Sequence, residues 1–135
     1  MITHVEHIGI AVANPEKAKG TFEKLLDRKR EKSETVFSEN VETHFFMVGE
    51  SQIELLESLN PEGVISKFIE KKGQGMHHIA LRTDDIYFEI KRLKALGFEF
   101  LSDSPKPGAD KKLIIFLHPR STEGVLVELC QDINL

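Results

Sequence analysis

Two pairs of side chains that commonly bind metal ions occur in the same order in the two halves of this 135-residue sequence. His7 precedes Glu54 in the first half, and His78 precedes Glu128 in the second half at nearly the same separation. Imidazole nitrogens and carboxylate oxygens are both ligands of divalent metal ions. Taken alone, each of the four could simply face water from the exposed side of a strand. Their ordered repetition favours a shared chemical role.

A single metal site follows if the two halves pack about a pseudo-twofold axis, because the two imidazoles and the two carboxylates then converge in one cleft. Such a set is a plausible ligand set for one divalent ion such as Zn, Co, Ni, Mn or Fe. Its negative charge offsets the charge of the ion, and open coordination positions remain for substrate oxygens or water. Without a cation the two carboxylates would repel each other, and the pKa of one of them would have to rise.

The elements that must position these residues also repeat. Both copies begin with a short apolar strand, His7–Val12 and His78–Thr83, that runs into a helix-start signal. The expected N-cap is Asn14 in the first copy and either Asp84 or Asp85 in the second. Apolar residues at helical spacing follow both caps. Each copy is therefore expected to place a helix directly after its first strand.

Strand-like runs follow both helices, and they complete the expected modules. In the first copy they are Thr43–Val48 and Gln52–Glu57; in the second they are Phe98–Leu101, Leu113–His118 and Val125–Gln131. Ser102–Lys112, which contains two prolines and a glycine, is expected to be a loop. The pattern predicts an α+β fold of two tandem β-α-β-β-β modules that form a curved mixed sheet around a metal-binding cleft. Module one spans about 1–59, a linking helix about 60–74 and module two about 75–133, within a single domain over 1–135.

Composition limits the kind of protein this is. The length is that of one globular domain, with 40% hydrophobic and 30% charged residues and a net charge of −4. The sequence lacks the basic excess that is typical of nucleic-acid-binding proteins. No apolar run approaches the length of a membrane span. The single cysteine excludes an internal disulfide and suits a reducing compartment. We expect a cytoplasmic protein with no nucleic-acid or membrane partner.

The remaining histidines and the cysteine have weaker signals. His77 should point to the face of its strand opposite to that of His78, and it is interpreted as structural. His4 is expected to be solvated, and no pattern assigns a role to His44. His118 could line a cleft or finish a turn. Cys130 is most simply a small buried thiol.

The paired modules with this order of His and Glu resemble the vicinal oxygen chelate superfamily over essentially the whole chain. Within it, the sequence looks most like the methylmalonyl-CoA epimerases. The more discriminating stretches are His77–Ala80 and Phe116–Pro119; other supporting stretches are His4–Val12, Gln52–Glu57, Gly75–Met76, Arg120–Ser121 and Gly124–Leu129.

The resemblance implies that His7, Glu54, His78 and Glu128 bind one divalent metal ion. It also implies an epimerase that interconverts the stereoisomers of methylmalonyl-CoA by abstracting the α-proton, through an enolate that the metal stabilises. The substrate would be an acyl-CoA or another thioester, and the protein would be a homodimer. Glu128 is the expected catalytic base, in addition to its role as a ligand.

One position departs from the pattern of the epimerases. Some of them carry a carboxylate base where this sequence has Thr43, which cannot act as a base at neutral pH. Glu42 should point to the other face of the strand, and Glu39 precedes the strand. The second base is therefore undetermined. Basic residues that could face the phosphates of CoA are Lys111, Lys112 and Arg120.

Two other functions remain open on the same residues. A glyoxalase I-like lyase that acts on a thiol hemithioacetal would use the same ligand types and the same proton-transfer chemistry. A non-catalytic member that binds a small molecule usually lacks a complete ligand set, and this sequence has one. A ring-cleaving dioxygenase is less favoured, because Glu54 would be a fourth candidate ligand beside a two-His, one-carboxylate triad.

Overall fold

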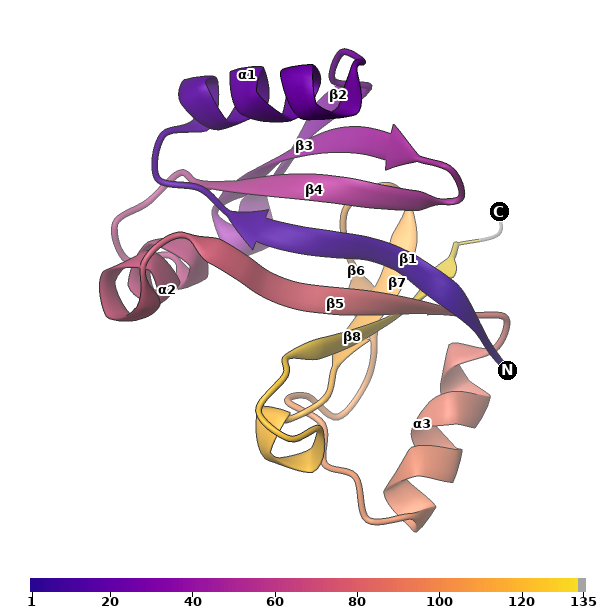
Figure 1. Cartoon of the computed structure of the whole chain (residues 1–135). Coiled ribbons are helices and arrows are strands. Elements are labelled where there is room, and N and C mark those ends of the chain that lie inside the picture. Colours follow the sequence, from indigo (N-terminus) through magenta and orange to yellow (C-terminus); the bar gives the residue numbers. More distant parts are fainter. Residues whose placement is uncertain (134–135) are drawn as a thin grey trace. The chain divides into compact units, whose positions relative to one another are not determined.

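The computed structural model describes residues 1–133, which form eight strands, three α-helices and two short 3-10 turns (Figure 1). The elements are β1 (Ile2–Ala11), α1 (Pro15–Leu26), β2 (Lys32–Val36), η1 (Phe37–Glu39), β3 (Val41–Val48), β4 (Ser51–Ser58), α2 (Val64–Lys72), β5 (Gly75–Thr83), α3 (Ile86–Ala95), β6 (Lys106–Pro107), β7 (Lys112–Phe116), η2 (Pro119–Ser121) and β8 (Val127–Asp132).

The chain divides into two compact units, and strand β1 contributes to both. Unit one contains residues 1–6 and the chain from His78 onward; unit two contains His7–His77. Both units contain mixed pairing, with one parallel and several antiparallel strand pairs. The predicted α+β class and the repeated β-α-β-β-β modules are confirmed. Helix α2, predicted as a linker, lies in unit two.

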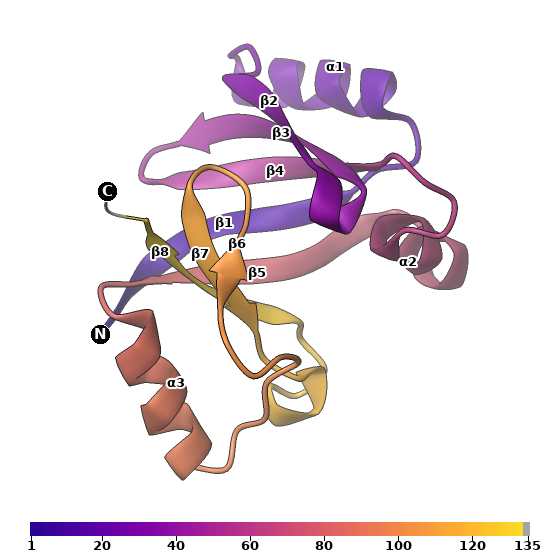
Figure 2. The same ribbon diagram turned by 180° about the vertical axis from the view of Figure 1, so that it is seen from behind.

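In unit two the strand order is β2-β3-β4-β1 (Figure 2). Strand β1 runs parallel to β4, whereas β3 is antiparallel to both β2 and β4. Helix α1 covers one face, where Phe22 and Leu26 pack near the buried Phe46 and Leu55. Helix α2 packs Ile65 into a separate cluster on strand residues that include Val41, Leu56 and Ala11.

In unit one the order continues β5-β8-β7-β6. Strand β5 runs parallel to β8, and β7 is antiparallel to both β8 and β6. Helix α3 buries Ile86, Ile90 and Leu93 in one cluster with Ile115 and Leu129 of the strands. The same connection of a strand, a helix and a parallel return strand therefore occurs in both units, as the repeated sequence predicts.

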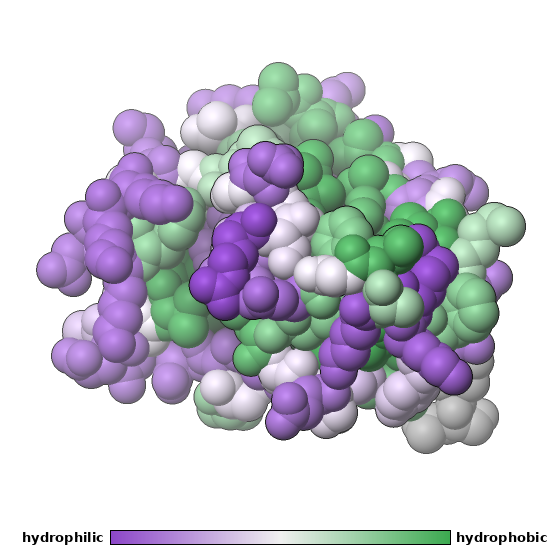
Figure 3. Space-filling view, turned by 90° about the horizontal axis from the view of Figure 1, so that it is seen from below, coloured by the Kyte–Doolittle hydropathy of each residue, from purple (hydrophilic) through white to green (hydrophobic). Residues whose placement is uncertain are grey.

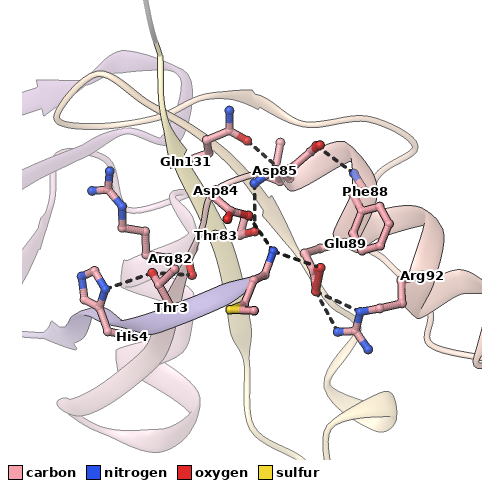
Figure 4. Close-up of polar contacts among 12 residues, drawn as sticks. Thr3, His4, Arg82, Thr83, Asp84, Asp85, Phe88, Glu89, Arg92 and Gln131 are labelled. Carbon is pink, nitrogen blue, oxygen red and sulfur yellow. Dashed lines mark hydrogen bonds and ion pairs between the residues drawn. The ribbon is translucent and has the colours of Figure 1, made fainter.

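The helix caps agree with the sequence. The side chain of Asn14 accepts a hydrogen bond from the Lys17 amide at 3.1 Å, and that of Asp85 accepts one from the Phe88 amide at 3.0 Å. Asp84, the alternative cap, instead binds the N-terminal ammonium of Met1 at 2.6 Å (Figure 4). Of the two aspartates, Asp85 is therefore the cap of α3.

Three segments differ from the predicted strand pattern. β2 has the polar sequence of an edge strand and was not predicted from hydrophobic periodicity. The strand predicted over Phe98–Leu101 is wrong, because this segment makes only one bridge, Phe100 to Leu117. Phe98 and Phe100 are apolar because they pack on the α3 cluster. The two-residue β6 lies inside the predicted loop and pairs with β7.

An ion-pair network around the buried Lys112 ties β7 to β8 in unit one. The Lys112 ammonium lies 2.6 Å from Asp132, 3.7 Å from Asp110 and 3.8 Å from Glu6. Burial opposes the charge of Lys112, but the hydrogen bond to Asp132 and the neighbouring carboxylates raise its pKa overall. Arg82 makes a further short ion pair with Asp132. Lys112 is thus engaged inside the structure and does not extend the basic surface suggested above.

Along residues 1–133 no helix combines the length and the apolar character needed to cross a membrane. The face shown in Figure 3 mixes hydrophilic and hydrophobic residues.

Replacing Asp132 by Asn should lower stability in a pH-dependent way. The hydrogen bond from Lys112, and that from Arg82, hold the pKa of Asp132 below its usual value despite the opposing effect of burial. The stabilisation is therefore complete above the unfolded-state pKa of about 4 and is lost as pH falls through the lower folded-state pKa. Because the Asp132 side chain is 41% exposed, we expect Asp132→Asn to lower the free energy of unfolding by about 0.5–1 kcal/mol at pH 7.

Urea unfolding at several pH values measures this difference, with Asp103→Asn, at an exposed loop position, as the control. The difference in free energy of unfolding between wild type and Asp132→Asn should decrease as the pH is lowered below about 4. A gap that stays constant with pH would mean that the ion pairs do not stabilise the fold.

Candidate functional site

The first predicted pair comes together within unit two. His7 on β1 and Glu54 on β4 share one face, because the parallel register places His7 opposite Gln52 and Gly9 opposite Glu54. The Nδ1 atom of His7 lies 3.1 Å from Oε2 of Glu54. Both side chains are buried. Gly9 carries no side chain, so nothing from that position of β1 stands opposite the carboxylate.

The second predicted pair comes together within unit one through the same kind of register. Ala80 on β5 lies opposite Glu128 on β8, which places His78 and Glu128 on one face. The Nε2 atom of His78 lies 3.5 Å from Oε1 of Glu128, and both side chains are buried. The ring of Phe116 packs edge-on against the His78 ring, with 5.5 Å between centroids. The small Ala80 stands opposite the carboxylate, as Gly9 does in unit two.

The donor chemistry of both pairs fits a divalent cation. Each pair brings an imidazole nitrogen and a carboxylate oxygen close together in a buried position, and a neutral nitrogen lone pair and a carboxylate both need a cation or a proton between them. Imidazole and carboxylate together match zinc and other divalent transition metals. The structure thus pairs each predicted histidine with its predicted carboxylate. The union of both pairs on one ion stays a prediction.

The face of β3 that carries Thr43 is the face of Glu54. Thr43 lies opposite Leu56, and Phe45 lies opposite Glu54, so all four residues share one side of unit two's sheet. Thr43 itself is buried. Glu42 falls on the reverse face, as predicted from the alternation of strand residues. No carboxylate on β3 therefore shares the face of the first metal pair.

The reverse face holds a histidine network to which the sequence assigned no role. His44 is buried, with Nδ1 at 2.6 Å from the Ser33 hydroxyl and Nε2 at 2.9 Å from the Glu57 carboxylate. Ligand atoms of Glu42, His44 and Glu57 lie within 4.8 Å of one another. Both ring nitrogens of His44 have partners within the fold, so its role is structural. Only the strand register, which pairs Ser33 with His44, makes the network recognisable.

His77 is packed away from the second metal pair, as interpreted from the sequence. Its ring stands edge-on to Phe68 of α2, with 4.9 Å between the ring centroids. Burial and the nearby Lys72 ammonium lower the pKa of His77. The residue therefore stays neutral over a wider pH range than a solvated histidine does.

The other candidates have local partners. Nδ1 of His118 accepts a hydrogen bond from the Arg120 amide at 3.1 Å, so His118 caps the start of the η2 turn. The Arg120 guanidinium lies 2.6 Å from Glu99. Cys130 is buried and forms no disulfide, and its thiol lies 3.7 Å from the Leu81 carbonyl. His4 is half-buried and hydrogen-bonds with Thr3 (Figure 4).

Comparison with known proteins agrees with the fold. Residues 6–116 match the family described as the glyoxalase/bleomycin resistance protein/dioxygenase superfamily. The chain belongs to this superfamily, the class of protein that the repeated modules indicate.

Its relatives include epimerases. The chain is 35% identical to the ethylmalonyl-CoA/methylmalonyl-CoA epimerase of Cereibacter sphaeroides, over 97% of this chain and 99% of that protein. It is 37% identical to the uncharacterized Bacillus subtilis protein YqjC, over 96% of this chain and 93% of that protein. A variant of the Streptomyces coelicolor methylmalonyl-CoA epimerase, in complex with 2-nitronate-propionyl-CoA, superposes with a TM-score of 0.92 at 28% identity. That match covers 98% of this chain and 96% of the other. These relatives support an epimerase-like enzyme.

The lowered pKa of His77 predicts an acid-sensitive fold. Below the unfolded-state pKa of about 6.5, unfolding takes up a proton that folded His77 does not bind, so stability falls as the pH drops toward the folded-state pKa. His77→Phe removes this titration and should lose less stability than wild type between pH 7 and pH 5. Urea midpoints at both pH values measure the effect, with His4→Gln as the control. Identical pH dependence of wild type and His77→Phe would contradict the assignment.

Proposed function

We propose that this protein is a metal-dependent epimerase that interconverts the stereoisomers of methylmalonyl-CoA, or of a closely related acyl-CoA. The observation that carries the proposal is the recurrence of one buried His–carboxylate pair in matching register positions of both units. Full-length similarity to an epimerase of ethylmalonyl-CoA and methylmalonyl-CoA supports the substrate class.

Four side chains would hold the metal ion: His7, Glu54, His78 and Glu128. Two neutral imidazoles and two carboxylates balance a divalent charge, and burial of all four limits competition from water. When bound, the ion would act as a Lewis acid on the thioester oxygen and so stabilise the negative charge that develops when the α-proton leaves. The identity of the metal is left to measurement, because this donor set accepts several.

Glu128 is the proposed proton-transfer group of unit one. Its carboxylate is buried beside His78 and is flanked by Ala80 and Phe116, its register partners on the neighbouring strands. Its register partners on both neighbouring strands are therefore uncharged. A buried carboxylate that is shielded from bulk water could accept the α-proton directly from the substrate.

The proposal extends to the setting in which the enzyme works. A cytoplasmic location is consistent with the single free cysteine, which is buried and makes no disulfide. A homodimer is proposed on family grounds.

The function is tested by NMR of methylmalonyl-CoA in deuterated buffer with protein of known metal content. The α-proton signal should disappear in the presence of protein that holds about one divalent ion per chain, and a chelator should abolish the exchange. The control is chelator-treated protein reloaded with the same ion. No exchange by fully loaded protein would overturn the proposed substrate, and thioester formation from methylglyoxal and a thiol would then favour the glyoxalase-like lyase. Purified protein that holds well below one equivalent of metal per chain would support the non-catalytic alternative.

The ligand assignment predicts which histidines retain metal. His7→Ala and His78→Ala should each reduce bound metal to well below one equivalent per chain, while thermal unfolding stays cooperative. His77→Ala is the matched control, because His77 adjoins His78 but packs against Phe68. Elemental analysis after dialysis measures retention. Full metal content in His78→Ala, or equal loss in all three variants, would contradict the assignment.

A further inference from the structure

Inversion at the α-carbon of a thioester imposes a requirement that one carboxylate does not meet. The proton leaves one face of the carbon and a proton returns to the opposite face, so a fixed substrate needs a proton-transfer group on each side. Unit one offers Glu128. Unit two would have to supply the second group on the face that carries His7 and Glu54.

Strand register shows which carboxylate reaches that face. Glu34 on the edge strand β2 lies directly opposite Thr43 on β3. Directly opposed residues of an antiparallel pair point to the same face, with Cβ atoms about 4.5–5.5 Å apart. Since Thr43 shares its face with Glu54, Glu34 stands on that face as well. Glu34 is half-buried, so its carboxylate is partly shielded from water and still accessible to a ligand.

The other acidic residues of this region are placed differently. Glu42 lies opposite Thr35 and Glu57, on the reverse face with His44. Glu39 belongs to the η1 turn that joins β2 to β3. Among the carboxylates of β2, η1 and β3, Glu34 is therefore the one that the sheet register places beside Thr43 on the face of Glu54.

Spacing along the sheet also suits a small substrate. Glu34 is separated from Glu54 by two strand intervals, about 10 Å, and by two residues along the strand direction. Thr43 and Phe45, which lie between them on β3, are both buried. An acyl group whose oxygens lie on the Glu54 side would therefore extend its α-carbon across β3 toward β2, within reach of a glutamate side chain.

We propose that Glu34 is the second proton-transfer residue, and that it replaces from β2 the carboxylate that Thr43 cannot supply from β3. This inference rests on the proposed function. The Glu34 carboxylate accepts the α-proton and becomes a neutral carboxylic acid, while the electron pair of the broken C–H bond moves into the thioester group as an enolate. The carboxylic acid form of Glu128, at the opposite face, then gives its proton to the α-carbon, which forms the new C–H bond and leaves Glu128 as a carboxylate. In the reverse direction Glu34 returns its proton and the roles exchange.

Deuterium exchange from each pure epimer of methylmalonyl-CoA tests the role of Glu34. The Glu34→Gln variant has the same side-chain size without the base. It should lose inversion, and exchange from one epimer should fall by about 10²–10⁴-fold. The other epimer should still exchange its α-proton with retention of configuration, because the opposite base remains. Bound metal and the unfolding temperature should match wild type.

Two further variants sharpen the test. Glu42→Gln, on the reverse face of the next strand, should invert both epimers as wild type does. Adding Thr43→Glu to Glu34→Gln should restore part of the inversion, because it returns a carboxylate to the same face. Wild-type inversion by Glu34→Gln would overturn the proposal, and so would equal slowing of both epimers. Absence of exchange in wild type would instead overturn the proposed function, so the two failures are distinguishable.

Discussion

Parallel pairing between the first and last strands of each module is the constraint on which the candidate site depends. β1 runs beside β4 and β5 beside β8, and each pairing sets a histidine and a glutamate from distant parts of the chain on one face. A slip of one residue would turn one partner to the opposite face and separate the pair. The helix packed on each module buries the apolar residues that fix this register. Chemistry and packing are therefore specified by the same alternation of residues.

The residues opposite the two carboxylates show that the register also provides space. Gly9 and Ala80 are the strand partners of Glu54 and Glu128, and larger side chains there would stand over the oxygens. Each pairing therefore leaves its carboxylate and its histidine facing each other with little between them. Burying such pairs is costly unless a proton or a cation lies between the donors. A metal ion, or a proton shared between the donors, would offset this cost in each unit.

The sequence was most informative where a local signal coincided with the repeat. Asn14 caps its helix as predicted, Asp85 is one of the two predicted caps, and each histidine of the repeat lies beside the glutamate of its own half, because cap chemistry and strand alternation are properties of short segments. Pairings between neighbouring strands could not be predicted in this way. The polar sequence of β2 does not predict that Ser33 pairs with His44 or that Glu34 pairs with Thr43, because both pairings depend on the register across a turn. Phe98 was misinterpreted for the opposite reason, because core packing on a helix gives the same apolar pattern as a strand.

The two modules are alike in their central strands and differ at their edges, and this difference separates the two chemical tasks. The parallel pairs that carry the histidines and glutamates repeat in register. The edge strands do not: β2 has five residues, four of them charged or polar, whereas β6 has two residues, one of them a proline. Proline is tolerated at an edge because it lacks an amide donor for a further strand. Under the proposed function, metal binding would use the equivalent donors of the repeat, whereas inversion would use different groups on the two faces of a carbon. An edge strand that is free to diverge can supply such a group without disturbing the ligands.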